Sequence, residues 1–302
     1  MARNFIIKVV ITLSILITIL LTSCSSKELD KAEDLYLDIP DSSFEAILVD
    51  QGIDTDGTIN QKMLAKDATQ VDVLELPYSS DRVIGDLSGI KGFVNLKKLI
   101  ATQHNIENID LSSNTILDTI YLAGNYISSI DISNNTNLLL LDVQSNQLNA
   151  IVGLAKATRL KNLNISFNDM QELIIQNASL KTLLASHNLL HTIDMGAAKS
   201  LKNILLTSNE LVTLNLSSNT LLETLLISDN QIQSIDLEHN TQLTHLYISS
   251  NSLTDLDVGN NQKLVDLKVD RNPYLSCIKI QNGQNIANVS ISENQALNVH
   301  CE

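Results

Sequence analysis

The sequence predicts a solenoid of stacked coils with one long parallel β-sheet. One stretch recurs about every 21 residues: "TLLISDNQIQSIDLEHNTQL" at 224–243 follows "NILLTSNELVTLNLSSNTLL" at 203–222 and precedes "HLYISSNSLTDLDVGNNQKL" at 245–264. Leu and Ile are abundant, whereas Trp is absent and aromatic residues make up 3% of the chain. The core must therefore be aliphatic and divided into many thin layers. Recurrence at a fixed period of 20–50 residues is typical of such repeat architectures.

The repeating unit fits the pattern L-x-x-L-x-L-x-x-N-x-L, which is the leucine-rich repeat pattern. Ten copies are spaced by 20 to 22 residues, and a degenerate eleventh copy, "VDVLEL", begins at Val71. The ten copies begin at Leu96, Leu117, Leu138, Leu160, Leu180, Leu201, Leu222, Leu243, Leu264 and Ile286. The fold class predicted is therefore a leucine-rich repeat solenoid, an α/β-type horseshoe or arc.

The first half of each repeat predicts a short strand. Leucines at the fourth and sixth positions alternate with polar residues, so both point inward, and strands of neighbouring coils pair in parallel about 4.8 Å apart. They form the concave sheet of the arc. The second half, such as "IDLSSNT" at 109–115, sends two more apolar residues inward and turns at Asn. It is too short for a full helix, so we expect turns or 3₁₀ segments on the convex side.

The ninth position of the repeat predicts a ladder of buried amides. An inward-facing Asn can bond backbone groups of its own and the adjacent coil, and leaving such groups unpaired costs about 1–3 kcal/mol each. The first full coil has His104 at this position. A metal-binding or catalytic His104 is the alternative to the structural one that we favour. The predicted ladder consists of Asn125, Asn146, Asn168, Asn188, Asn209, Asn230, Asn251, Asn272 and Asn294.

Both ends of such an array need a lid, because no coil buries its hydrophobic face alone. The segment 38–70 does not repeat, and Phe44, Ile47 and Leu48 are placed there at helical spacing. This pattern predicts a small helical N-terminal cap. The chain then divides into a signal peptide (1–23), an acidic tether (24–37), the cap (38–70), the repeats (71–272), and the last coil with a C-terminal cap (273–302).

The N-terminus, "MARNFIIKVVITLSILITILLTSC", is typical of an export signal. Arg3 and Lys8 precede an uncharged run of 13 residues, Val9–Leu21, which is short for a transmembrane helix. The ending "LTSC" resembles the lipobox of bacterial lipoproteins, which implies cleavage before Cys24 and acylation of that Cys. Ser25, rather than Asp, resembles outer-membrane lipoproteins. The alternatives are an ordinary signal peptide or an N-terminal anchor helix.

The charge of the chain argues against nucleic acid as a partner. Removal of residues 1–23 would change the formal charge from −14 to −16. An acidic protein is repelled by phosphate backbones and by anionic lipid headgroups. The membrane is therefore expected to be reached through the N-terminal lipid alone.

Several segments together resemble the exported leucine-rich repeat lipoproteins of Gram-negative bacteria. They are "DIPDSSFEAILVDQGIDTDGTI", "DLSGIKGFVNLKKL", the "IDLSSNT" half-repeats and "NPYLSCI", and the repeats are also similar to those of the internalins. The resemblance implies a non-enzymatic binding role with a ligand that differs between members. It places the protein at the cell envelope, on the periplasmic or the surface side of the outer membrane.

Two cysteines besides Cys24 lie near the C-terminus. We expect Cys277 and Cys301 to form a disulfide in the C-terminal cap, since an exported protein meets an oxidising compartment. Such a bond would contribute on the order of 3 kcal/mol. Two free thiols are the alternative.

No cofactor or metal is expected from the motifs. The turn "IDTDGTI" at 53–59 matches part of a calcium-binding EF-hand loop, but Gly52 and Met63 stand where its first and last ligands belong. A plain Asp/Gly turn is favoured, and calcium binding stays open. No HExxH, P-loop, GxSxG or CxxC motif occurs. An enzyme would need a polar constellation that the sequence does not offer.

The candidate binding surface is the outward side of the concave sheet. Leu184, Leu205, Leu226 and Tyr247 follow one another on four consecutive strands and are flanked by small polar residues. Such an exposed apolar strip predicts a docking site for a protein or peptide. The alternatives are drift within a leucine-rich sequence, or a strip covered by the C-terminal tail. The predicted ligand-binding residues are Tyr121, Asp142, Asn164, Leu184, Leu205, Leu226, His245, Tyr247 and Lys268.

Two other functions remain alternatives. A carbohydrate-binding protein would need aromatic platforms, for which only Tyr121 and Tyr247 qualify on this surface. A purely structural envelope lipoprotein would need no ligand.

Overall fold

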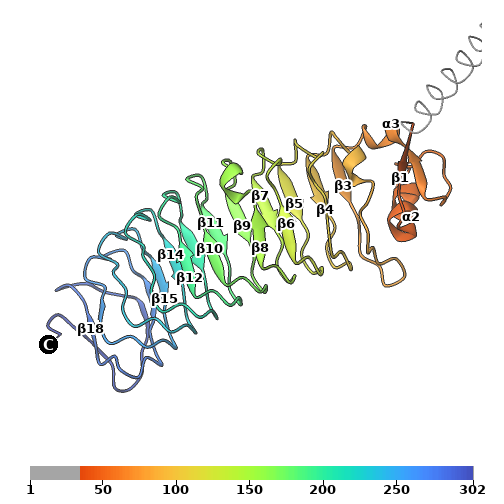
Figure 1. Cartoon of the computed structure of the whole chain (residues 1–302). Helices are drawn as coiled ribbons and strands as arrows, with labels where there is room; N and C mark the ends of the chain where they lie inside the picture. Colours follow the sequence, from red (N-terminus) through yellow and green to blue (C-terminus); the bar gives the residue numbers. More distant parts are fainter. Residues whose placement is uncertain (1–34, 302) are drawn as a thin grey trace, which may run out of the picture.

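Residues 35–301 form an elongated solenoid in the computed structural model, which describes this part of the chain (Figure 1). The predicted signal peptide, Cys24 and most of the tether lie outside the described residues. Among the residues described, no helix has the length and apolar character needed to cross a bilayer.

A parallel sheet of eleven strands runs the length of the solenoid. Each strand pairs with that of the next coil position by position, so that equivalent repeat positions form straight rows. We call this the long sheet. Its strands are β3 (Val73–Glu75), β4 (Lys98–Ile100), β5 (Thr119–Tyr121), β7 (Leu140–Asp142), β9 (Asn162–Asn164), β11 (Thr182–Leu184), β13 (Asn203–Leu205), β14 (Thr224–Leu226), β15 (His245–Tyr247), β17 (Asp266–Lys268) and β19 (Asn288–Ser290).

The opposite side, which we call the back, contains short strands besides the expected turns and the 3₁₀ helices η1 (Ile90–Gly92) and η2 (Leu154–Lys156). The strands form three groups: β6 (Ser129–Asp131) with β8 (Ala150–Val152), β10 (Glu172–Ile174) with β12 (Thr192–Asp194), and β16 (Leu256–Asp257) with β18 (Cys277–Lys279) and β20 (Ala296–Asn298). The sequence analysis did not predict these strands. The alternation in segments such as "SID" at 129–131 and "TID" at 192–194 is long enough for three paired residues. Because strands stack at similar spacing on both sides, the body bends only gently (Figure 1).

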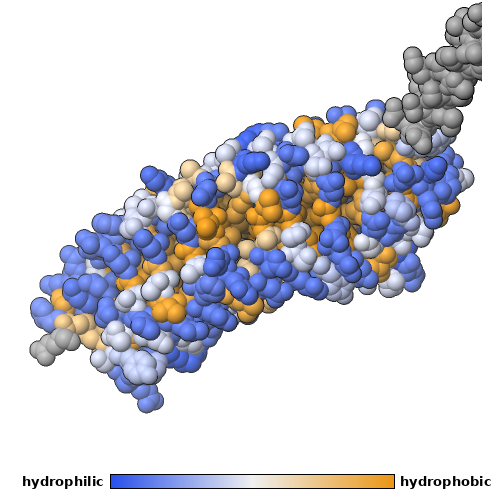
Figure 2. All heavy atoms as spheres, in the orientation of Figure 1, coloured by the Kyte–Doolittle hydropathy of each residue, from blue (hydrophilic) through white to orange (hydrophobic). Residues whose placement is uncertain are grey.

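The aliphatic core is continuous from the cap to the last coils. The two inward positions of each strand are at most 1% exposed from Leu99 to Val269. Burial of one such side chain contributes about 1.5–3 kcal/mol. Figure 2 shows hydrophobic residues also gathered along the middle of the visible face, between polar margins.

The amide ladder joins each coil to the one before it. In a representative coil, Nδ2 of Asn209 donates to the carbonyls of Ala185 (3.0 Å) and Leu206 (2.9 Å), and Oδ1 accepts from the backbone N–H of Leu190 (3.1 Å). The residue before each ladder position has a left-handed φ in every coil from Gln103 to Arg271. The members that bond in this way are Asn125, Asn146, Asn168, Asn188, Asn209, Asn230, Asn251 and Asn272.

Both ends of the ladder use a different residue. His104 is 2% exposed, accepts from the N–H of Ile84 through Nδ1 (3.3 Å) and contacts the carbonyl of Leu76 through Nε2 (3.1 Å). Asn294, predicted as the last member, is instead exposed. Gln295 takes its place and donates from Nε2 to the carbonyls of Val269 (3.3 Å) and Asn272 (3.2 Å), because its longer side chain reaches them from one residue further on.

A second column of buried amides runs along the turns of the back. Asn240 Nδ2, for example, donates to the carbonyls of Leu216 (3.2 Å) and Asn219 (2.9 Å). Ala157 and Ala198 interrupt this column. Its members are Asn114, Asn135, Asn177, Asn219, Asn240 and Asn261.

A mixed unit covers the first coil. It contains β1 (Tyr36–Asp38), α2 (Ser42–Asp50), β2 (Lys62–Leu64) and α3 (Ala65–Ala68), and β1 pairs with β2 antiparallel. Asp41 caps α2, because its Oδ1 accepts from the N–H groups of Ser43 and Phe44. Phe44 and Leu48 are fully buried on the inner face of α2. The cap therefore closes the core at this end.

A disulfide closes the other end of the chain. Cys277 in β18 bonds Cys301, with the two Cα atoms 5.7 Å apart. This bond ties the tail that follows β20 to the back of the solenoid.

Candidate functional site

The sheet register brings eight of the nine predicted ligand-binding residues into one row across the long sheet. Leu184 pairs with Leu205, Leu205 with Leu226, and Leu226 with Tyr247. We call these four residues the leucine row, and each of them is partly exposed. Tyr121, Asp142 and Asn164 continue the row on one side, and Lys268 on the other. His245 lies in the adjacent row, between Thr224 and Asp266.

The described tail does not cover the leucine row. Strand β20 pairs with β18 on the back, on the opposite side of the core from the long sheet. The row is also bordered by small polar side chains at the neighbouring outward positions, such as Thr182 and Thr224 on one side and Ser186 and Ser228 on the other. A ligand can therefore approach the leucines without displacing bulky neighbours.

Tyr247 is held in place at the C-terminal end of the leucine row. Its hydroxyl donates to Oδ2 of Asp266 (2.9 Å), and Nζ of Lys268 lies 3.9 Å from the centre of its ring. A cation over a tyrosine face is attracted by the ring quadrupole. Tyr121 lies in the same row of the sheet, three strands beyond Leu184, and Nζ of Lys98 lies 6.0 Å from its ring. A tyrosine beside a lysine thus occurs at the C-terminal end of the leucine row and again at Tyr121 on β5.

Asp142 provides a carboxylate in a partly buried position of the row. Burial raises its pKa above the ordinary value, and hydrogen bonds from the Gln144 N–H and the Asn164 side chain oppose the shift. The bond from Gln144 N to Oδ1 is 3.2 Å long. This group can accept from a polar part of a ligand.

The structure also shows an aromatic pair that the sequence analysis missed. The Phe167 ring, 52% exposed, stacks on the imidazole of His187 with centres 4.3 Å apart and planes 13° from parallel. Both residues take the left-handed position before the ladder Asn, with φ of 58° and 55°. In the flanking coils Ser145 and Ser208 occupy it. The signal was a large ring at a position otherwise given to small or polar residues.

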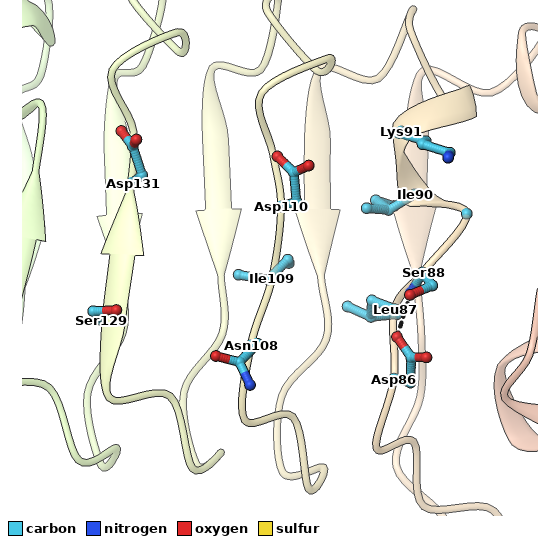
Figure 3. Close-up of a pocket in the computed structure, with 11 residues that line it drawn as sticks. Asp86, Leu87, Ser88, Ile90, Lys91, Asn108, Ile109, Asp110, Ser129 and Asp131 are labelled. Atoms are coloured by element: carbon cyan, nitrogen blue, oxygen red, sulfur yellow. Dashed lines mark hydrogen bonds between the residues drawn. The ribbon is translucent and has the colours of Figure 1, made fainter.

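The back has a shallow pocket of about 470 Å³ near the N-terminal end. Figure 3 shows the carboxyl groups of Asp86, Asp110 and Asp131 in this pocket, together with Lys91. Hydrogen bonds within local turns occupy these carboxylates, since each accepts from a serine N–H two residues on. Bonds from Ser112 and Ser133 lower the pKa of Asp110 and of Asp131. The pocket is therefore built from the turns of the repeat.

The acidic turn at 53–59 is partly satisfied by local hydrogen bonds, whereas Oδ2 of Asp54 is buried without a hydrogen-bond partner among the residues described. Asp56 accepts from Thr58 and Asn60, which lowers its pKa, whereas burial raises the pKa of Asp54. In the part of the chain described, no group of three or more His, Cys, Asp or Glu side chains could hold a metal ion.

The stacked coils, the repeat consensus and the amide ladder give the chain a leucine-rich repeat solenoid fold. No protein-family model and no curated protein sequence matches it. Solved structures share its fold. An internalin (inlF) of Listeria monocytogenes is 17% identical, with a TM-score of 0.57 over 87% of this chain and 96% of that one.

Two other structures extend the comparison. The leucine-rich repeat domain of APL1B is 22% identical, with a TM-score of 0.59 over 72% of this chain and 64% of that one. The plant peptide hormone receptor RGFR1, in complex with RGF2, is 20% identical, with a TM-score of 0.54 over 67% of this chain and 38% of that one. The structural neighbours thus include internalin-type and receptor leucine-rich repeat proteins.

Proposed function

We propose that the protein is a non-enzymatic binding module that holds a protein or peptide partner over the leucine row. The observation that carries the proposal is the row itself: one outward position on each of four consecutive strands holds a large apolar side chain. Apolar surface that stays partly exposed in a well-packed repeat is characteristic of an interaction site. RGFR1, whose fold is similar, was solved with RGF2, which supports a peptide as one kind of occupant.

The polar ends of the row suit an extended polypeptide. Hydrogen-bond donors and acceptors flank the leucines on both sides: Tyr247 with Lys268 on one side, and Asp142 with Asn164 on the other. A short extended peptide can reach from one group to the other. The leucines between them provide contacts for apolar side chains. A sugar would instead need ring faces along the middle of the row, where aliphatic side chains stand. Carbohydrate binding at Phe167 is the second candidate, because that ring is half exposed.

The proposed site of action is the cell envelope, with the protein attached through a lipid on Cys24. The support is the sequence "LTSC" after an apolar run of 13 residues. Labelling with a radioactive fatty acid, together with Cys24→Ala, tests this step. Label that persists in the C24A variant, or membrane attachment without label, would contradict it.

The binding proposal is tested with Leu205→Asp/Leu226→Asp in the full-length protein. A matched control is Val152→Asp/Ile174→Asp, which removes two exposed apolar side chains from the back at positions where Asp131 and Asp194 are the paired residues. Envelope extracts and a glycan array serve as ligand sources. We expect a bound protein or peptide that the control retains and the L205D/L226D variant loses. Equal retention by both variants, or binding to glycans alone, would refute the proposal.

A further inference from the structure

The two ends of the solenoid are closed to different extents. In the last coil, the inward side chains Val289 and Ile291 are 39% and 36% exposed, whereas their equivalents one coil earlier, Leu267 and Val269, are fully buried. The same inward positions are at most 1% exposed in all preceding coils from Leu99 onward. The inward aliphatic side chains of the last coil are therefore partly exposed to solvent.

The N-terminal end shows what a covered end looks like. There Leu74 and Leu76 of the first coil are at most 1% exposed beneath α2. The cap also satisfies a hydrogen-bonding group on the edge of β3 that pairs with no strand, because Nε2 of Gln51 donates to the carbonyl of Glu75 (2.7 Å). In the residues described, only β20 follows β19, the terminal strand of the long sheet, and β20 pairs with β18 on the back. Figure 1 draws no helix at this end of the solenoid.

Strand β19 has a hydrogen-bonding edge that faces away from the solenoid. Asn288 directs its N–H to the carbonyl of Val265 (3.0 Å), and the Ser290 carbonyl accepts from the N–H of Val269 (2.9 Å). In a parallel ladder the backbone groups of alternate residues point to opposite edges. The N–H and C=O of Val289, between these two residues, therefore point outward. A free edge over exposed apolar side chains is a template for strand pairing.

This end is also nearly uncharged. Between Ile280 and Val299 the only charged residue is Glu293, although the chain carries a formal charge of −14. Two copies of an acidic protein repel one another over most of their surfaces. The last coil therefore adds little repulsion, so contact of this end with an equally acidic molecule is not opposed by its own charge.

We propose that the C-terminal end docks on the same end of a second copy of the chain. A two-fold axis perpendicular to the sheet, midway between the Val289 residues of the two copies, would pair β19 of both copies in antiparallel fashion. Val289 would then exchange both hydrogen bonds with the Val289 of its partner copy, as hydrogen-bonded pairs of antiparallel strands do. The inward side chains of both copies lie on one side of the joined sheet, so the two cores become continuous. The free Val289 groups complement themselves under this symmetry, which favours a second copy over a different protein.

The test uses the full-length chain in a non-ionic detergent, with light scattering to measure its mass. We expect the mass of a dimer for the wild type and of a monomer for Val289→Lys, because a buried lysine at the axis opposes pairing. Val212→Lys is the matched control, since Val212 is likewise 39% exposed but lies away from the end. It should stay dimeric. Circular dichroism checks that each variant is folded.

A second pair of variants tests the symmetry and does not depend on a disruptive change. Hydrogen-bonded antiparallel partners have Cα atoms about 5.5 Å apart, within the range that a disulfide spans. Val289→Cys should therefore form a disulfide-linked dimer under mild oxidation, and Val212→Cys should not. A monomeric wild type, a V289K variant that remains dimeric, equal cross-linking of both cysteine variants, or a different protein bound at this edge would each overturn the proposal.

Discussion

The ladder residues set the balance between burial and hydrogen bonding in each coil. A buried Asn that bonds three backbone groups costs little, whereas the same groups without it would be buried and unpaired. The stability of the array therefore depends on single side chains at the ninth repeat position.

Replacement of Asn209 by Ala should lower the free energy of unfolding by about 3 kcal/mol, because the Ala185 and Leu206 carbonyls and the Leu190 N–H lose their partner. Denaturant unfolding followed by circular dichroism measures the change. Asn215→Ala is the control, since the side chain of Asn215 is exposed and accepts only from Ser217. Equal losses in the two variants would show that the ladder bonds are dispensable.

His104 should make stability depend on pH. Burial lowers its pKa below the ordinary value of 6.5, and the N–H of Ile84 donates to a nitrogen that must stay unprotonated. Below pH 6.5 the unfolded chain binds a proton that the folded chain resists, so stability should fall with pH, by at most about 1.4 kcal/mol per pH unit.

The His104→Asn variant places at this position the residue used by the next coils and should lose this pH dependence while staying folded. Thermal melts of both proteins between pH 5 and 7.5 provide the comparison. Parallel curves for the two would contradict the assignment.

At the scale of elements, the strands on both sides depend on neighbours rather than on their own length. Most have only three residues, and an isolated pair of that size would not be stable in water. Each strand is held by the strand before it and the strand after it. The last coil lacks a following neighbour, and there the Cys277–Cys301 bond substitutes for part of the missing contact.

The Cys277→Ser/Cys301→Ser variant should therefore lose about 3 kcal/mol of stability. Its hydrogen exchange should speed up chiefly in β18, β19 and β20. Mass spectrometry of peptides from the native protein provides the test, with central strands such as β13 as the internal reference. Faster exchange spread evenly over all coils would mean that the bond acts on the unfolded chain alone.

Most of the fold was predictable from the sequence. Apolar and polar residues alternate within each strand and the whole pattern repeats about every 21 residues, which together determine the side chains that point inward. The structure confirms the solenoid and pairs Cys277 with Cys301. The back strands were not predicted, since three-residue segments such as "SID" at 129–131 are equally compatible with a turn. Gln295, rather than Asn294, ends the ladder because its longer side chain reaches the carbonyls of the preceding coil, which the repeat pattern does not reveal. The Phe167–His187 pair was missed because the two residues become neighbours only when adjacent coils stack. The role of the leucine row stays a prediction, because outward leucines indicate a surface that can bind a partner but do not identify that partner.

At the scale of the whole molecule, stability is a sum of similar interfaces between coils. Deletion of residues 201–221, one complete coil, should leave a folded protein with lower stability, because β11 can then pair with β14 in the same register that β13 uses. Deletion of 36–70 should instead expose Leu74 and Leu76 and cause aggregation. Circular dichroism and light scattering distinguish the outcomes. Loss of structure after the first deletion would show that the coils are not interchangeable.

The straight register of the long sheet also acts as a ruler. Four rungs about 4.8 Å apart span roughly 14 Å from Leu184 to Tyr247, whereas same-side residues of an extended peptide recur every 6.6–6.8 Å or so. A peptide lying along the body can therefore seat one residue on Leu184, the next between Leu205 and Leu226, and a third beside Tyr247. Under the proposed function, we expect this spacing to favour peptides with the matching side-chain periodicity and to limit a close fit to about five residues.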